Sequence, residues 1–172
     1  MLGLVEALDA VGLVGVPFDT LVGGAAHDFG RPEVRQEFHG RLTAGEFVYV
    51  IIMTPCGPIS IARDDANAPQ LYDRSGRIMP CPVGWESYRE KHWTLVLFTI
   101  ETIELCDRLG VHVLVENLAD VSTPGPWFWR AKSGHGSLFA LPEWIAMRTK
   151  VVLQSVTTAQ CGWGSLFREW TT

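Results

Sequence analysis

The residue in this sequence best suited to covalent chemistry is Cys56, in the segment IIMTPCGPISIAR (residues 51–63). A cysteine thiolate is a strong nucleophile, and a turn at the end of a strand can expose it to a substrate. Pro55 and Pro58 would stiffen such a turn. The alternative interpretation is a small buried thiol without a chemical role, since cysteine is among the most frequently buried residue types. Composition alone favours this second interpretation.

A carboxyl group that could act with this thiol belongs to Glu116, which precedes Asn117 at the end of the apolar segment VHVLVEN. If the segments before Cys56 and Glu116 are neighbouring parallel strands, both side chains face one cleft, because ligands bind at the carboxyl ends of such strands. A carboxyl group there could hydrogen-bond a ring nitrogen while the thiolate attacks the ring. Arg63 would offset the developing negative charge or bind a phosphate.

The elements that must position these groups alternate along the chain. Apolar runs predict buried strands, and periodic stretches bounded by Pro or Gly predict helices. Strands are expected at 13–18, 47–53, 111–117 and 151–156, and helices at 2–11, 32–45, 91–109 and 142–148. This alternation is typical of a three-layer, Rossmann-like α/β fold, with a mostly parallel sheet and helices on both faces. We therefore predict a single domain over residues 1–172, a length that suits one hydrophobic core.

The composition excludes several classes of protein. With a net charge of −5 and 19% charged residues, the chain is not a polycationic nucleic-acid binder. Its four cysteines lack CxxC spacing, so we expect neither a metal site nor a disulfide framework. No apolar run reaches membrane-spanning length, and no secretory signal is recognisable. The sequence therefore predicts a soluble, intracellular protein of cytoplasm or nucleus, without a membrane partner.

The Pro-Cys and Glu-Asn pairs resemble the motifs of the DNA cytosine-5 methyltransferases, which have the class I methyltransferase fold. In that family the cysteine attacks C6 of cytosine and the glutamate binds the base. The resemblance implies these roles for Cys56 and Glu116, with Asn117 in the same motif and Arg63 stabilising the adduct or contacting the DNA backbone. It also implies that DNA is the partner.

The same resemblance implies S-adenosylmethionine as the cofactor. Asp19, after the first expected strand, falls where methyltransferases place an acid on the ribose, and Asp28 falls near the adenine side. Pro55 of the Pro-Cys motif joins them as an implied cofactor-binding residue. The glycine-rich first loop of the family is absent, because the sequence begins at the helix that should follow it. We therefore expect a methyltransferase-type sheet without its first strand.

A resemblance over almost the whole chain is to a loosely defined, uncharacterised group of proteins from viral, mobile-element-like and protist genomes, similar to a diverged branch of the methyltransferase fold. The matching blocks are His27-Asp28-Phe29, Pro55-Cys56 through Arg63, Glu116-Asn117 with Ser122 and Trp127, and Gln160-Cys161-Gly162. The chain departs from true cytosine-5 methyltransferases at Gly57, where they usually carry glutamine. It also lacks their later arginine-rich motif and room for a target-recognition domain.

Three further residues are expected to contact the nucleic acid. Ser60 lies four residues after Cys56 in the same block. Trp127, in the loop segment PGPWFWR, would stack an extruded base, and Arg130 would bind phosphate. The alternative is that the tryptophans of this loop cover a sheet edge as part of the core, and that interpretation is favoured.

Three functional hypotheses follow from the sequence. The first is a cytosine-5 methyltransferase-like protein. The second is a non-catalytic, Rossmann-like remnant of a viral or mobile-element protein that binds nucleic acid or a partner, which the absent glycine-rich loop favours. The third is a cysteine hydrolase on an α/β sheet, which needs a histidine near Cys56. The five histidines are scattered and are interpreted as surface or core residues: His27, His39, His92, His112 and His135.

Overall fold

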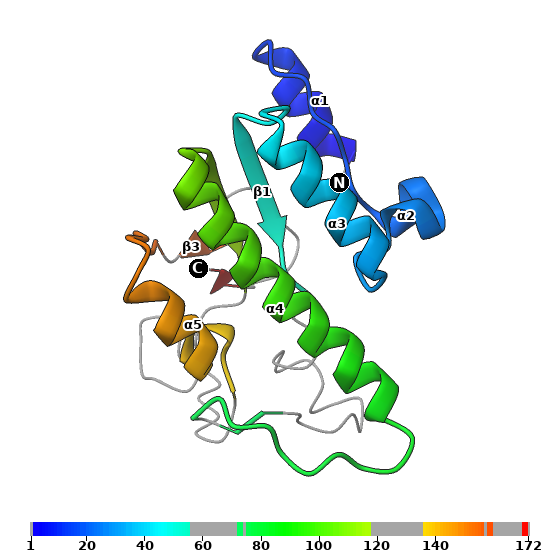
Figure 1. Ribbon diagram of the computed structural model, residues 1–172, viewed down its shortest axis with the longest axis vertical. Coiled ribbons are helices and arrows are strands. Elements are labelled where there is room, and N and C mark those ends of the chain that lie inside the picture. Colours follow the sequence, from blue (N-terminus) through cyan, green and yellow to red (C-terminus); the bar gives the residue numbers. More distant parts are fainter. Residues whose placement is uncertain are drawn as a thin grey trace. The chain divides into compact units, whose positions relative to one another are not determined.

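The computed structural model describes residues 2–55, 72–73, 75–117, 136–156, 158–159 and 170–171. The predicted contacts at Cys56, Ser60, Arg63, Trp127 and Arg130 lie outside the described residues. The chain divides into two compact units, Met1–Gly40 and Arg41–Thr172. Figure 1 shows the helices and strands that make up each unit.

The first unit is helical. It contains α1 (Leu2–Ala10), α2 (Thr20–Gly23), the 3-10 helix η1 (Gly24–His27) and the start of α3 (Pro32–Thr43). Helix α1 confirms the prediction at 2–11. Helix α3 confirms the prediction at 32–45, with Pro32 in its first turn, where the missing N–H of proline leaves no hydrogen bond unmade.

The expected strand at 13–18 is not formed. The chain instead turns back on α1, where the amide of Leu13 donates to the carbonyl of Leu8 at 3.0 Å. The side chain of Val14 is 89% exposed. An apolar run becomes a strand only where a neighbouring strand accepts its backbone hydrogen bonds, and 13–18 has no such neighbour among the described residues.

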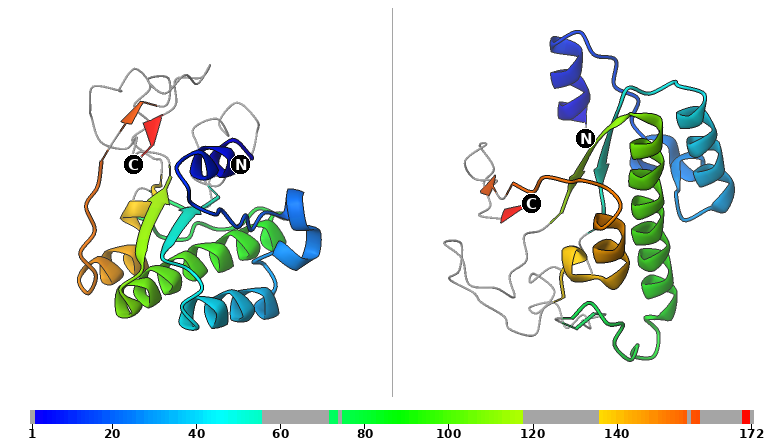
Figure 2. Two further views of the ribbon diagram at one scale, coloured as in Figure 1. Left: turned by 90° about the horizontal axis from the view of Figure 1, so that it is seen from above. Right: turned by 60° about the vertical axis from the view of Figure 1, so that its left-hand side comes forward.

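The second unit contains a parallel pair of strands joined through a helix. Strand β1 (Tyr49–Met53) pairs with β2 (His112–Glu116) in a register from Tyr49↔His112 to Met53↔Glu116. Helix α4 (Glu86–Leu109) lies between them in the sequence, as parallel strands require a crossover connection. Figure 2 shows the strands side by side, with α4 along one face of the pair. The two strands confirm the predictions at 47–53 and 111–117.

The core of this unit lies between that face of the strands and two helices. Ile52, Val113 and Val115 face it, as the two-residue repeat of a strand dictates. Helix α5 (Pro142–Arg148) follows the 3-10 helix η4 (Leu138–Ala140) and packs against α4. The fully buried members of the core include Tyr72, Val96, Ile103, Leu138, Leu141 and Met147.

The sequence predicts the carboxyl end of α4 better than its amino end. Its carboxyl end agrees with the prediction, because Gly110 takes the left-handed conformation (φ +69°) that stops a helix. Its amino end lies at Glu86, five residues before the expected start at 91. The helix thus begins inside residues 64–90, where the sequence shows no sustained period and predicts a long loop with one short helix. Near this carboxyl end, burial raises the pKa of the Cys106 thiol to about 11, which keeps the thiol protonated at neutral pH.

The remaining predictions in this unit have mixed outcomes. Helix α5 confirms the helix at 142–148. The expected strand at 151–156 is not formed, and a two-residue strand, β3 (Thr158–Ala159), pairs antiparallel with β4 (Trp170–Thr171). The part of the chain that the structure describes is therefore a mixed α/β protein with a small, open, parallel two-stranded sheet. No helix within it is both long enough and apolar enough to span a bilayer.

Candidate active site

The two sequence motifs leave the sheet at the same edge. Thr54 and Pro55 follow β1, and Asn117 follows β2. The register opposes Met53 to Glu116, so both strands end at the same level. The condition on which the site hypothesis depends is therefore met, since the strands that lead to the two motifs are parallel neighbours. Glu116 is half-buried there, and its relation to the Cys56 thiol stays a prediction.

A buried hydrogen bond ties the two strand ends together. The side-chain amide of Asn117 donates from Nδ2 to the carbonyl of Thr54 at 2.9 Å. The exposed fractions of Asn117 and Thr54 are 1% and 5%. In the structure Asn117 thus holds the backbone at the end of β1. The role beside Glu116 that the resemblance implies for it stays a prediction.

The Thr54 side chain is also bonded, to helix α4. Its Oγ1 lies 3.1 Å from Oγ1 of Thr99, whose own hydroxyl donates to the carbonyl of Leu95 at 2.9 Å. A hydroxyl carries one proton, so Thr54 must be the donor in the first of these bonds. The end of β1 is thus attached to both β2 and α4.

A histidine that the sequence did not single out binds the next carbonyl of the chain. Nε2 of His92 lies 2.7 Å from the carbonyl oxygen of Pro55, and Nδ1 lies 3.0 Å from the Tyr72 hydroxyl. A carbonyl oxygen only accepts, so Nε2 carries a proton. Both side chains are buried, with 4% of His92 and 1% of Tyr72 exposed.

The environment of Tyr72 keeps its hydroxyl protonated. Burial is the main cause that raises the pKa of Tyr72 to about 12, and the charge of Arg89 partly opposes it. At neutral pH this hydroxyl can therefore donate to Nδ1 of a neutral His92 ring. When the His92 ring is neutral, Tyr72 donates to Nδ1 and Nε2 donates to Pro55.

A sequence signal for His92 existed, and none existed for Tyr72. His92 lies at helical spacing from Val96 and Ile103, which makes it a polar residue on an otherwise apolar stripe of α4. Tyr72 belongs to the segment predicted as a long loop, where no periodicity marks a buried position.

Asp19 and Asp28, the two acids that the resemblance implies at the cofactor, accept hydrogen bonds from backbone amides of their own loops. Oδ1 of Asp19 accepts from the amide of Leu21 at 2.8 Å and caps α2. Oδ1 of Asp28 accepts from the amide of Gly30 at 2.9 Å, just before α3. Each is a standard helix-entry contact that needs no ligand.

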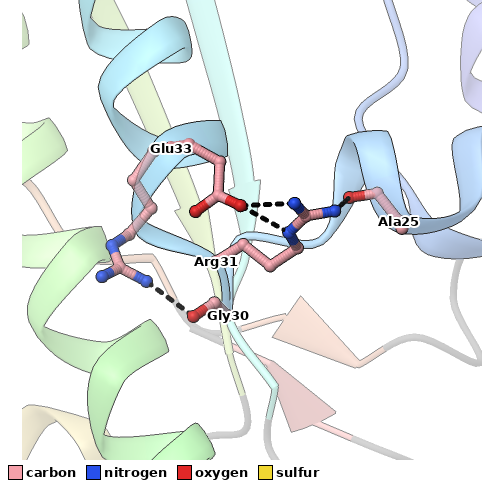
Figure 3. Close-up of polar contacts among 5 residues, drawn as sticks. Ala25, Gly30, Arg31 and Glu33 are labelled. Carbon is pink, nitrogen blue, oxygen red and sulfur yellow. Dashed lines mark hydrogen bonds and ion pairs between the residues drawn. The ribbon is translucent and has the colours of Figure 1, made fainter.

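Two arginines donate to backbone carbonyls of the segment around Asp28. Figure 3 shows the guanidinium of Arg31 donating to the Glu33 carboxylate and, at 3.5 Å, to the carbonyl of Ala25. Arg35 donates to the carbonyl of Gly30 at 3.0 Å. Next to these contacts the rings of Phe18, Phe29 and Phe38 pack on one another, with centroids 5.2 to 5.7 Å apart.

The S-adenosylmethionine site that the resemblance implies stays a prediction, and the structure gives each of its three residues a contact within the chain. No strand precedes Asp19, and the carboxylates of Asp19 and Asp28 accept backbone N–H groups of their own loops. The carbonyl of Pro55, the third implied residue, accepts from His92. Metal chemistry has no visible support either, because no three His, Cys, Asp or Glu side chains within the described ranges gather as a metal ion would require.

Comparison with known proteins gave no match. No family model matches the chain, and neither a curated protein nor a solved structure does. The likeness of the Pro-Cys and Glu-Asn motifs to cytosine-5 methyltransferases therefore stays a prediction. The functional argument depends on the geometry of the chain's own residues.

That geometry bears on the hydrolase hypothesis. His92 lies close to the residue before Cys56, as a cysteine hydrolase would require. Its two ring nitrogens are, however, both engaged, with Nε2 donating to Pro55 and Nδ1 next to the Tyr72 hydroxyl. A general base needs a lone pair directed at the thiol. In this arrangement His92 holds the backbone, and its relation to the Cys56 thiol stays a prediction.

Proposed function

We propose that this chain is a DNA cytosine-5 methyltransferase-like protein, with Cys56 as the nucleophile and Glu116 as the base-binding residue. The main supporting observation is the parallel pairing of β1 and β2, in which Met53 lies opposite Glu116. The Pro-Cys and Glu-Asn motifs then follow adjacent strands at one edge, where open α/β sheets bind their ligands. The β1–α4–β2 unit would be one repeat of a larger three-layer, Rossmann-like sheet.

The proposed chemistry begins with addition to the base. The Cys56 thiolate adds to C6 of cytosine, and as the S–C6 bond forms, the π electrons of the C5–C6 bond move towards C5. A protonated Glu116 donates to N3 and stabilises the negative charge that develops in the ring. Arg63 offsets the remaining charge or binds a DNA phosphate.

Addition to C6 makes C5 nucleophilic. S-adenosylmethionine, when bound, would supply the methyl group that C5 attacks and would leave as S-adenosylhomocysteine. Loss of the C5 proton and elimination of the Cys56 thiolate from C6 would then restore the ring and free the enzyme. Asp19, Asp28 and Pro55 stay the residues that the resemblance implies for this cofactor, and no step of the transfer is assigned to them. The elements argued from the structure are those that hold the strand end before Cys56, namely Asn117 and His92.

Covalent trapping tests the nucleophile. A DNA duplex containing 5-azacytosine should form a denaturation-resistant adduct with the chain, because N5 can take a proton in place of a methyl group and no methyl donor is needed. We expect Cys56→Ser to reduce trapping roughly a thousand-fold or more, as loss of a catalytic nucleophile does. Cys81→Ser, at a half-buried thiol elsewhere, should leave trapping unchanged. Trapping that survives Cys56→Ser would refute the assignment.

One observation favours the second candidate, a non-catalytic module. The carboxylates of Asp19 and Asp28 are bonded within their own loops, as in a fold that binds no cofactor. Calorimetric titration with S-adenosylmethionine separates the two candidates. The methyltransferase-like proposal expects saturable heat, unchanged by Cys56→Ser, since the thiol acts on the base. A titration without heat, together with no trapping on 5-azacytosine, would favour the module.

A further inference from the structure

We propose that His92 and Tyr72 are positioning residues that fix the direction of the Pro55–Cys56 peptide. The inference rests on the proposed function only in taking Cys56 as the reactive thiol. Its basis is the contact of 2.7 Å between Nε2 of His92 and the carbonyl oxygen of Pro55, which belongs to the peptide bond leading into Cys56.

The first step concerns the proton on His92. Nε2–H is the tautomer that can bind a carbonyl, whereas the other neutral tautomer would turn a lone pair towards the Pro55 oxygen. In a neutral ring, the Tyr72 hydroxyl, 3.0 Å from Nδ1, favours the required tautomer because it can donate to that nitrogen. Tyr72 thus acts on Pro55 through His92.

The second step concerns the rigidity of the elements involved. His92 lies on α4, whose next turns bury Val96 and Ile103 completely. Tyr72 is part of the same hydrophobic core. A ring held by a packed helix on one side and by a buried hydroxyl on the other has little freedom, so the carbonyl that it binds is fixed relative to the core.

The third step concerns the combination of contacts on consecutive residues. The Thr54 carbonyl accepts from Asn117 of the segment after β2, and the Pro55 carbonyl accepts from His92 of α4. The proline ring restricts the backbone torsion between these two carbonyls. Three constraints therefore act on two successive residues, and together they define where the backbone enters Cys56. We call Asn117, His92 and Tyr72 the strand-exit clamp.

The fourth step concerns the alternative of simple core packing. An apolar side chain could occupy a buried position on α4 without needing two polar partners, and burying an imidazole is unfavourable unless its hydrogen bonds are made. His92 makes two, and one is to the peptide before the proposed nucleophile. The hydrogen bond from His92 thus fixes the orientation of the Pro55 carbonyl, which packing alone does not require.

The test compares two amide substitutions that differ in reach. In His92→Gln the amide nitrogen takes the approximate place of Nε2 and can still donate to Pro55. In His92→Asn the same group ends near the place of Nδ1 and falls short of it. The readout is the alkylation rate of Cys56 by iodoacetamide, followed by peptide mass spectrometry and compared with a synthetic peptide of residues 54–60. This readout needs neither DNA nor cofactor.

We expect wild type and His92→Gln to share one rate, distinct from that of the peptide. In His92→Asn we expect the alkylation rate of Cys56 to change by about five-fold in the direction of the peptide rate. This factor corresponds to the loss of one typical hydrogen bond. Alkylation of Cys106 in the same sample is the control, because this fully buried thiol reacts only if the fold opens. Equal rates for His92→Gln and His92→Asn, with Cys106 protected in both, would overturn the proposal. So would a wild-type rate equal to that of the peptide.

A spectroscopic measurement keeps the proposal testable if His92→Asn fails to fold. Side-chain ¹⁵N correlation spectra of the wild-type protein should show His92 as the Nε2–H tautomer, and Tyr72→Phe should add a population of the other tautomer. A wild-type Nδ1–H tautomer would overturn the inference. Absence of trapping on 5-azacytosine DNA, with the alkylation series as expected, would instead remove the proposed function and leave the positioning role intact.

Discussion

Gly76→Ala is expected to lower the free energy of unfolding by about 3 kcal/mol, because two unfavourable effects combine at this position. Gly76 has φ +76°, a conformation that residues with a Cβ rarely adopt. A Cβ at this position would also lie 2.6 Å from the carbonyl oxygen of Ala140 and 2.7 Å from Cα of Leu141. Both of those atoms are backbone, so neither can rotate away.

The turn that contains Gly76 is built to approach that backbone closely. The carboxylate of Asp73 accepts from the amides of Ser75 at 2.8 Å and Arg77 at 3.0 Å, which closes the turn. Tyr72, directly before it, is the buried residue that binds His92. Displacing the turn would therefore disturb the strand-exit clamp as well as the core.

Gly84→Ala is the matched control for this prediction. Gly84 has φ +89°, and a Cβ there would meet nothing within 4 Å. This variant isolates the backbone conformation and should lose only about 1 kcal/mol. Urea unfolding followed by tryptophan fluorescence measures both variants. Equal losses would mean that the turn does not pack against Ala140 and Leu141 as the structure has it.

The sequence predicted best those elements whose signals are local. Pro32 and Pro142 mark where α3 and α5 begin. Gly110 marks where α4 ends. The strands β1 and β2 were also predicted, because a continuous apolar run suits a strand that is covered by a helix. That the two strands are neighbours was only a condition of the site hypothesis, and the structure supplied it.

The sequence failed where the outcome depends on a distant partner. The runs 13–18 and 151–156 are also rich in apolar residues, yet neither forms a strand, since local composition cannot show whether another strand lies beside them. In the site, too, local features were predicted and contacts between distant residues were not. The edge that carries Glu116 and Asn117 was predicted, whereas the contact of His92 with Pro55 joins residues 37 positions apart and left no spacing pattern to recognise.

Asn117→Asp is expected to produce the second large loss, about 3 kcal/mol at pH 7. Asparagine donates from Nδ2 to the buried carbonyl of Thr54, and an aspartate of the same shape cannot. The substitution would place a carboxylate against a carbonyl oxygen at a position only 1% exposed to solvent. Burial of an unpaired charge and loss of the donor act in the same direction.

The pH dependence of this loss gives a sharper test than its size. Burial should raise the folded-state pKa of the introduced carboxyl group above its unfolded-state value, so the folded state binds the proton more tightly. Stability relative to wild type is then greatest below the unfolded-state pKa and declines as the pH rises towards the folded-state pKa. The protonated group carries an O–H that can donate to Thr54, which restores the lost bond at low pH.

Asn117→Leu serves as the control, because leucine has a similar volume but neither a charge nor a donor. Its loss relative to wild type should not change between pH 7 and pH 4.5, while the loss in Asn117→Asp should shrink by about half over that range. Urea unfolding of the three proteins at both pH values measures the difference. If the two variants respond identically to pH, the side chain of residue 117 does not face the Thr54 carbonyl. The attachment of β1 to β2 at the edge that leads into Cys56 would then have to be sought elsewhere.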